Sequence, residues 1–185
     1  MFKRKDCRLR PLNSDDLELV LEWRNAPGIR EMMFTDHIIT LAEHQRWFAG
    51  IQSNPGHSRH WVFECNDKPL GQVNITQIDE ENRRCYWGFF IGAADAPRDS
   101  GSVMGFLVLE AIFERMNMNK LCSEVLASNT VSINYHKKLG FVEEGCFKEH
   151  VIKQGSLEDI VCLAYFSSAW QQRKNMLFDR FFGGK

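Results

Sequence analysis

The chain has 185 residues, of which 44% are hydrophobic, and its formal net charge is −1. This hydrophobic content predicts one compact domain over residues 1–185 with a sizeable core. The balanced charge argues against a surface that binds nucleic acid or a membrane. Apolar runs fall far short of the ~20 residues of a membrane span, and the charged N-terminus lacks the apolar stretch of a signal peptide.

Six cysteines are scattered without a C-x-x-C pair. Most lie in apolar runs, where a reduced cysteine behaves as a small hydrophobe. His57 and His60 form an H-x-x-H pattern, but the neighbouring Gly56 favours a solvated loop over a pair of ligands. We therefore expect neither a disulfide scaffold nor a metal site, and we expect a reducing, cytoplasmic setting.

An initial strand at residues 8–12 precedes a helix that starts at residues 13–16 and ends near the W-R-N sequence of residues 23–25. Acidic residues in the first turn suit the helix dipole. A second helix begins in the capping box of residues 40–43, and His44 lies on its inward-facing apolar stripe. A histidine on such a stripe is commonly a satisfied core residue, so its position alone does not indicate a site.

Two further strands are predicted at residues 61–65 and 69–78. Alternation places Gln72, Asn74 and Thr76 on one face of the second strand. These side chains contact a ligand if that face borders a cleft, and they are ordinary solvent-exposed positions if it does not. The sequence does not separate the two interpretations.

The middle of the chain has the arrangement of an anion-binding turn. A strand at residues 86–92 leads through the loop of residues 93–101 into a strongly apolar helix at 102–116, which should lie buried on the sheet. Free backbone N–H groups and the positive end of a helix bind phosphates at such a turn.

A second strand-to-helix unit covers residues 120–141. The strand at residues 121–126 is followed by a helix that Ser128 or Asn129 caps and a glycine ends. On this helix Asn129, Ser132 and His136 share one face, because they are spaced i, i+3, i+7. Two closing strands, 141–151 and 157–166, and a last helix at 167–176 follow. The aromatic tail either docks on a second subunit, which makes a homodimer possible, or covers its own chain.

The spacing N-x-x-S-x-x-x-H-x-K-x-G-F of residues 129–141 resembles the second acyl-CoA-binding motif of the GCN5-related N-acetyltransferase (GNAT) superfamily. The sequence Arg98-x-x-Gly101-x-Val103 matches two of three positions of that family's phosphate-loop signature, Q/R-x-x-G-x-G/A. Val103 departs from it, because a small residue there lets the backbone approach the pyrophosphate. The longer block K-L-x-x-E-V-L-x-x-N-x-x-S-I-x-x-H-K-K-L-G-F is most similar to the branch that acetylates a UDP-linked 4-amino sugar in the pseudaminic acid pathway. Similar blocks occur in ribosomal-protein N-terminal acetyltransferases.

The resemblance implies a mixed α/β (α+β) GNAT fold. Its central, mostly antiparallel twisted sheet has about seven strands, which splay at the CoA site and are flanked by helices. The CoA-binding core would cover about residues 85–141, the acceptor-side segments about 20–80, and the C-terminal helix and tail 167–185. Acetyl-CoA is the implied co-substrate, and no metal is implied.

The same resemblance assigns site residues. Asn129 would bind the pantetheine arm, and a backbone amide near Phe90 or Ile91 would face the thioester oxygen. The remaining predicted cofactor contacts are Arg98, Ser100, Gly101, Ser102, Val103, Ser132, His136 and Lys138.

His136 occupies the position at which the family often has a tyrosine, so it is our candidate proton donor for the leaving thiolate. A histidine there could donate as a neutral tautomer or with a raised pKa. Tyr135 is the second candidate, and the alternative for His136 is a cofactor contact without catalysis. The general base stays open among Glu124, Glu64 and an ordered water.

The acceptor contacts predicted from the resemblance and from residue chemistry are Arg24, His44, Asn74, Thr76 and Trp87. The predicted reaction is direct acetyl transfer to a UDP-linked amino-deoxy sugar. The alternative enzyme is a ribosomal-protein N-terminal or other small-amine acetyltransferase. The non-enzymatic alternative is an acyl-CoA-binding module.

Overall fold

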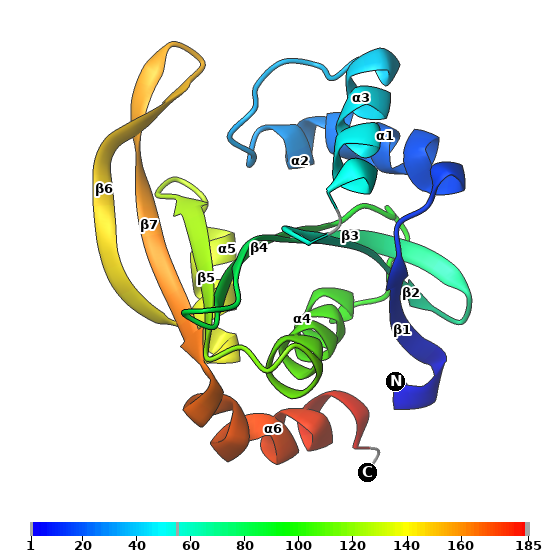
Figure 1. Cartoon of the computed structure of the whole chain (residues 1–185), viewed down its shortest axis with the longest axis vertical. Helices are drawn as coiled ribbons and strands as arrows, with labels where there is room; N and C mark the ends of the chain where they lie inside the picture. The colour runs from blue at the N-terminus through cyan, green and yellow to red at the C-terminus, as the bar shows by residue number, and fades with distance from the viewer. Residues whose placement is uncertain (1, 55, 184–185) are drawn as a thin grey trace.

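The computed structural model describes residues 2–54 and 56–183, which leaves the last two residues of the predicted tail outside (Figure 1). The strands are β1 (Cys7–Pro11), β2 (Arg59–Cys65), β3 (Lys68–Asp79), β4 (Arg84–Ile91), β5 (Lys120–Leu126), β6 (Val142–Lys153) and β7 (Ser156–Phe166). The α-helices are α1 (Leu17–Asn25), α2 (Pro27–Arg30), α3 (Leu41–Ser53), α4 (Ser100–Glu110), α5 (Thr130–Leu139) and α6 (Ser167–Phe182). Short 3₁₀ turns precede β1 (Arg4–Asp6) and α1 (Ser14–Asp16), and a π-helical segment (Ala111–Arg115) extends α4.

The seven strands form one sheet in the order β1-β2-β3-β4-β5-β7-β6. Neighbouring strands are antiparallel except β4 and β5, which run parallel. These two strands pair at residues 84–86 with 120–122 and then diverge. Beyond that point β4 faces a gap on its β5 side. A mixed, mostly antiparallel sheet of seven strands that splays in its middle confirms the predicted architecture.

Helices cover both faces of the sheet (Figure 1). On one face α4 packs on the strands and α6 crosses beneath it, while α1 and α3 lie on the other face. Val103 and the next six residues of α4 are all buried, because the sheet covers one side of this helix and α6 covers another. The predicted burial of this apolar helix is therefore confirmed. Among the described helices, none is both long and apolar enough to span a bilayer.

The last helix is longer than predicted, since α6 continues to Phe182 instead of ending near residue 176. Its aromatic end packs on Phe106 of α4: the rings of Phe178, Phe181 and Phe182 lie 5.9, 6.5 and 5.4 Å from it between centroids. The aromatic tail thus covers its own chain.

Two expectations about cysteine and histidine are wrong. Cys7 and Cys65 form a disulfide, because the register of β1 and β2 places them directly opposite each other. His60 lies in β2 rather than in a solvated loop, and its Nδ1 is 2.7 Å from Asn74 Oδ1 across the strands. The other four cysteines are free. Within the described residues no group of three or more His, Cys, Asp or Glu could hold a metal ion.

Candidate active site

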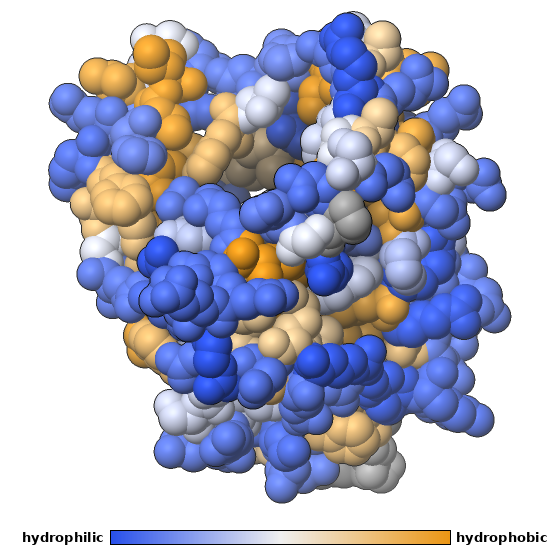
Figure 2. Space-filling model, in the orientation of Figure 1, coloured by the Kyte–Doolittle hydropathy of each residue, from blue (hydrophilic) through white to orange (hydrophobic). Residues whose placement is uncertain are grey.

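The divergence of β4 and β5 opens a cavity of about 370 Å³, here called the central cleft. On the molecular surface a hollow lies between the β6–β7 hairpin and the helices α1–α3 (Figure 2). The lining comes from the α2 region (Gly28, Ile29 and residues 32–34), β4 (87–91), β5 (123–126), α4 (Gly101) and the α5 region (Asn129, Val131, Ser132, Tyr135 and His136). Sequence segments more than a hundred residues apart therefore meet at one cleft.

Asn129 begins α5 and sets the polar face that this helix turns to the cleft. Its Oδ1 accepts a hydrogen bond from the Ser132 N–H (3.0 Å), which leaves its amide nitrogen for a ligand. Gly140 ends the helix in the left-handed region (φ +116°), which a glycine adopts without strain. Asn129, Ser132 and His136 line the cleft together, whereas the Lys138 side chain is exposed and is not part of the lining formed by described residues.

His136 is 1% exposed and packs against the rings of Trp87, Phe89 and Phe141. Its Nδ1 lies 2.7 Å from the Ser132 carbonyl oxygen. Because a carbonyl only accepts, Nδ1 carries the ring proton. Burial lowers the pKa of His136 to about 4, although the bond to Ser132 opposes this shift. The ring is therefore neutral near pH 7.

The free nitrogen of that neutral ring is an acceptor. Nε2 of His136 is buried and has no hydrogen-bond partner among the described residues. A raised pKa would have made His136 a proton donor, but the pKa is lowered and the other nitrogen holds the proton. The free Nε2 of His136 is therefore a hydrogen-bond acceptor at the cleft, and its role as the proton donor stays a prediction.

Tyr135 connects α5 to the first turn of α4. Its hydroxyl donates to the Gly101 carbonyl oxygen (2.7 Å), and burial raises the pKa of the phenol. The ring lies close over Gly105, where a Cβ atom would collide with the hydroxyl. The hydrogen bond from the Tyr135 hydroxyl to the Gly101 carbonyl therefore fixes the first turn of α4 against α5.

The first turn of α4 leaves one backbone donor open. Both the N–H and the hydroxyl of Ser100 donate to the Pro97 carbonyl (3.1 and 2.6 Å). The Ser102 N–H donates to the Asp99 carbonyl (2.9 Å). Gly101 lines the cleft, and no described residue accepts a bond from its N–H. Gly101 therefore supplies the amide that this turn can offer to an anion.

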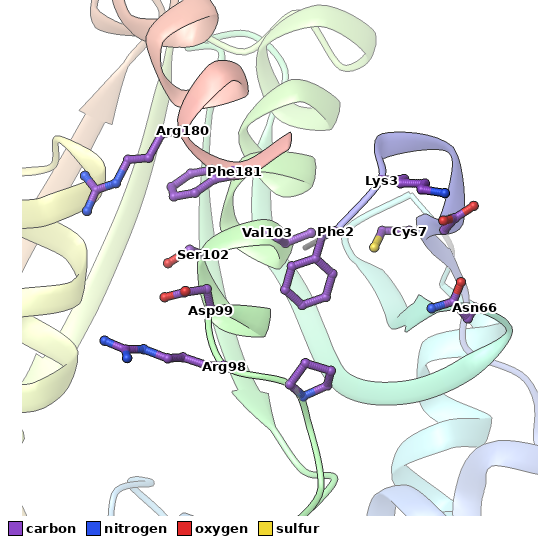
Figure 3. Close-up of a pocket in the computed structure, with 12 residues that line it drawn as sticks. Phe2, Lys3, Cys7, Asn66, Arg98, Asp99, Ser102, Val103, Arg180 and Phe181 are labelled. Atoms are coloured by element: carbon purple, nitrogen blue, oxygen red, sulfur yellow. The ribbon is translucent and has the colours of Figure 1, made fainter. Parts of the chain in front are cut away.

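A larger cavity of about 910 Å³, the outer cavity, lies against the same turn and reaches the N-terminal segment at Lys3 (Figure 3). Val103 lines this cavity and is fully buried, so its extra bulk lies away from the lining of the central cleft. Figure 3 shows the guanidinium groups of Arg98 and Arg180 on the same side of the α4 N-terminus. Arg180 and Phe181 come from the end of α6, and nothing in the sequence pattern had connected them with this turn.

On the acceptor side, β5 brings Glu124 to the cleft. Glu64, the other carboxylate considered as a base, is buried in ion pairs with Arg8 (3.0 Å) and Arg10 (2.5 Å). Those two pairs join Glu64 of β2 to β1, and Glu64 is not among the described residues that line the central cleft, so it is not placed to act as the base. Trp87 lines the cleft at 5% exposure, and its Nε1–H has no partner among the described residues.

Three basic side chains, the cation cluster, lie at the end of α1 and on α2 and α3. Arg24 Nη1, Arg30 Nε and His44 Nε2 are each buried without a partner in the described chain. Burial and then the Arg30 charge lower the pKa of Arg24; burial and then the Arg24 charge lower that of His44. Arg24 is therefore near enough to Arg30 and to His44 to disfavour the doubly charged form of each pair. The cluster lacks hydrogen-bond acceptors among the described residues. Because an unsatisfied buried polar group costs ~1–3 kcal/mol, a ligand that supplied acceptors would be bound favourably.

Of the five predicted acceptor contacts, Trp87 is among the described residues that line the cleft, whereas Arg24, His44, Asn74 and Thr76 are not. Asn74 is bound to His60, and Thr76 is half-buried in β3 outside the described lining of the cleft. Asn25, from the W-R-N sequence, fixes the segment between α2 and α3: its amide nitrogen donates to the Ile39 carbonyl (2.8 Å), and its oxygen accepts from the Ile39 N–H (2.9 Å).

The sheet parts between two parallel strands, and an open amide at a helix start and a polar helix face lie beside the gap, which is the arrangement expected of an acyl-CoA-dependent acyltransferase of the GNAT fold. The family described as "Acetyltransferase (GNAT) domain" matches residues 6–142, and the chain belongs to this family. It is an N-acetyltransferase with acetyl-CoA as its co-substrate.

The relatives differ in their acceptors. Acetyltransferase PseH of Campylobacter jejuni is 24% identical over 130 residues, which are 70% of this chain and 79% of PseH. Spermidine N(1)-acetyltransferase of Escherichia coli K12 is 23% identical over 162 residues, which are 86% of this chain and 85% of that enzyme. The structure of spermidine N-acetyltransferase from Vibrio cholerae in complex with CoA and spermine superposes with a TM-score of 0.83 at 20% identity, covering 90% of this chain and 99% of that one. At that identity the likeness shows the fold.

Proposed function

We propose that the protein transfers the acetyl group of acetyl-CoA to the 4-amino group of a UDP-linked amino-deoxy sugar, the step known from pseudaminic acid biosynthesis. The observation that carries this proposal is the cation cluster, whose residues are not in the described lining of the cleft but whose Arg30 directly follows the lining residue Ile29. Arg24, Arg30 and His44 hold buried nitrogens without acceptors, and a diphosphate would supply them. Charge-assisted hydrogen bonds from guanidinium to phosphate are among the strongest in proteins.

The charges of the cleft distinguish this acceptor from a polyamine. Among the described residues that line the cleft, Glu124 carries the one carboxylate. A polyamine bears several positive charges, and the nearby arginines would repel it. A UDP-sugar instead brings two negative phosphates toward Arg24 and Arg30 and one amine toward Glu124.

The opposite side of the cleft suits the co-substrate. The Gly101 N–H is open to the pyrophosphate, the Asn129 amide nitrogen to the pantetheine arm, and the unpaired edge of β4 near Phe90 and Ile91 to the thioester oxygen. Preorganised donors at a developing oxyanion are a large catalytic term. Arg98 and Arg180 flank the same turn (Figure 3), and we assign them to the phosphates of the adenosine end.

His136 moves the proton in this proposal. The acceptor nitrogen bonds to the acetyl carbon, His136 Nε2 takes the surplus ammonium proton, and the C–S bond breaks. The imidazolium, with a pKa near 4, is a much stronger acid than a thiol with an ordinary pKa near 8.5, so it returns the proton to the leaving thiolate. The lowered pKa of His136 thus favours the transfer of the proton from the imidazolium to the thiolate. In this proposal Glu124 orients the acceptor amine.

A small-amine acceptor is the second candidate. It is favoured by Glu124 at the cleft and by the spermidine acetyltransferases among the relatives. Turnover confined to spermidine or spermine, and abolished by Glu124→Gln, would establish it.

The test is thiol release from acetyl-CoA with UDP-4-amino-4,6-dideoxy-N-acetyl-β-L-altrosamine, spermidine, spermine and a peptide N-terminus as separate acceptors. We expect turnover with the UDP-sugar and a more than tenfold loss of kcat/KM for it in Arg24→Met, with an unchanged KM for acetyl-CoA. Arg46→Met is the matched control, because Arg46 is exposed on α3. Equal losses in both variants, or no turnover with the UDP-sugar, would refute the assignment.

A further inference from the structure

The tip of the β6–β7 hairpin is joined to the segment between α2 and α3. Lys153 Nζ donates to the Met33 carbonyl (2.6 Å) and forms an ion pair with Asp36 Oδ1. The Gln154 N–H donates to the other carboxylate oxygen of Asp36 (2.9 Å). Three bonds therefore link two segments that are more than a hundred residues apart in sequence. Figure 1 shows the hairpin and the α2–α3 region on either side of the opening of the molecule.

Burial separates this contact from an ordinary surface ion pair. Lys153 is 8% exposed and is the buried position of β6, whose other residues are exposed or half-buried. Lys148 of the same strand pairs with Asp159 inside the hairpin and keeps 75% of its side chain exposed. An ammonium withdrawn from water is costly unless it is paired. Removal of Asp36 would leave Lys153 without its charged partner.

The segment that Lys153 holds is part of the site. Met32, Met33 and Phe34 line the central cleft at its α2 end. The Asp36 carbonyl also accepts a hydrogen bond from Arg30 Nη1 (2.9 Å). The contact at the hairpin tip therefore continues, through Asp36, into the cation cluster.

We propose that Lys153 and Asp36 are positioning residues for the acceptor: together they hold residues 32–34 as a roof over the acceptor end of the cleft and orient Arg30. Neither residue contacts the reacting atoms. The assignment of this end of the cleft to the acceptor rests on the proposed function. The three bonds of Lys153 and Gln154 to Met33 and Asp36, here called the latch, do not depend on it.

This role predicts a selective kinetic effect. Misplacement of the acceptor nitrogen by an ångström costs about a hundredfold in a reaction that depends on alignment. Acetyl-CoA is held from the other side of the cleft, at Gly101 and Asn129, and does not depend on the roof. Loss of these contacts should therefore lower kcat/KM for the acceptor at least tenfold and leave the KM for acetyl-CoA within twofold.

The first measurement needs no acceptor: hydrogen exchange of residues 31–40 in the full chain, compared for the wild type, Lys153→Met, Asp36→Asn and the control Lys148→Met. We expect faster exchange in the first two variants and wild-type exchange in the control. Equal exchange in all four proteins would overturn the latch, whichever acceptor the enzyme uses. Asp36→Asn keeps the test decisive if Lys153→Met folds poorly, because Asp36 is partly exposed.

The second measurement is steady-state kinetics with the acceptor that turns over, the UDP-sugar or spermidine. A fall in kcat/KM for the acceptor in both single variants, no further fall in the double variant and no change in Lys148→Met are the expected results. Altered exchange with an unchanged kcat/KM for the acceptor would overturn the positioning role. Turnover of spermidine instead of the UDP-sugar would refute the proposed acceptor and leave the latch to be judged by these same ratios.

Discussion

Replacement of His136 by phenylalanine gives the sharpest test of the site's electrostatics. In the folded protein burial lowers the pKa of His136 to about 4, from 6.5. The unfolded chain therefore binds a proton below pH 6.5 that the folded chain does not bind until about pH 4. Stability is consequently present above pH 6.5 and is lost as the pH falls through this window, at ~1.4 kcal/mol per unit. Between pH 7 and pH 5 the loss from His136 alone is ~2 kcal/mol.

The assay is urea unfolding followed by circular dichroism at pH 7, 6 and 5 for the wild type and His136→Phe. The pKa values of His44 and His60 are also lowered by burial, but both residues are present in both proteins. The difference between the two pH profiles therefore isolates His136. We expect the wild type to lose ~2 kcal/mol more than the variant between pH 7 and pH 5. Parallel profiles would mean that His136 titrates as it does in water, and would refute the lowered pKa on which the return of the proton to the thiolate depends.

Three further predictions follow from single contacts. Gly105→Ala should cost ~1–3 kcal/mol in urea unfolding and raise the KM for acetyl-CoA, because the new methyl group collides with the Tyr135 hydroxyl; an unchanged KM would contradict the role of that hydroxyl at α4. Arg180→Gln should weaken acetyl-CoA more than acetyl-pantetheine, which lacks the phosphoadenosine end, whereas equal effects on initial rates would place Arg180 outside the phosphate site. Alkylation of the unreduced, denatured protein should label four of its six cysteines by mass spectrometry, and labelling of all six would show that Cys7 is reduced.

The elements that the sequence predicted well are those set by local chemistry. The capping box at Thr40 begins α3 through a reciprocal bond with Glu43, and Gly140 ends α5 in the conformation that glycine favours. Both depend on neighbours within four residues, so their patterns are readable without the fold. The shared face of Asn129, Ser132 and His136 is equally local, because helical spacing alone fixes it.

What the sequence could not provide depends on register and burial. Cys7 and Cys65 meet only because β1 and β2 pair in one particular register. The proton of His136 sits on Nδ1 because that atom reaches the Ser132 carbonyl, and its pKa is low because aromatic rings close around it. Arg180 lies near the first turn of α4 because α6 packs on α4 (Figure 3). No local pattern encodes any of these.

In the proposed reaction the acceptor and acetyl-CoA are held by different parts of the chain, and this division has a physical consequence. The co-substrate side is built from α4 and α5, which share one core and are tied together by Tyr135 and Gly101. The acceptor side depends on a segment held by polar contacts at Asp36, Lys153 and Asn25. Polar contacts at a partly exposed segment open at lower cost than a packed core. We therefore expect the proposed acceptor side to open more readily than the proposed acetyl-CoA side, so that a substitution that changes the acceptor need not disturb the cofactor.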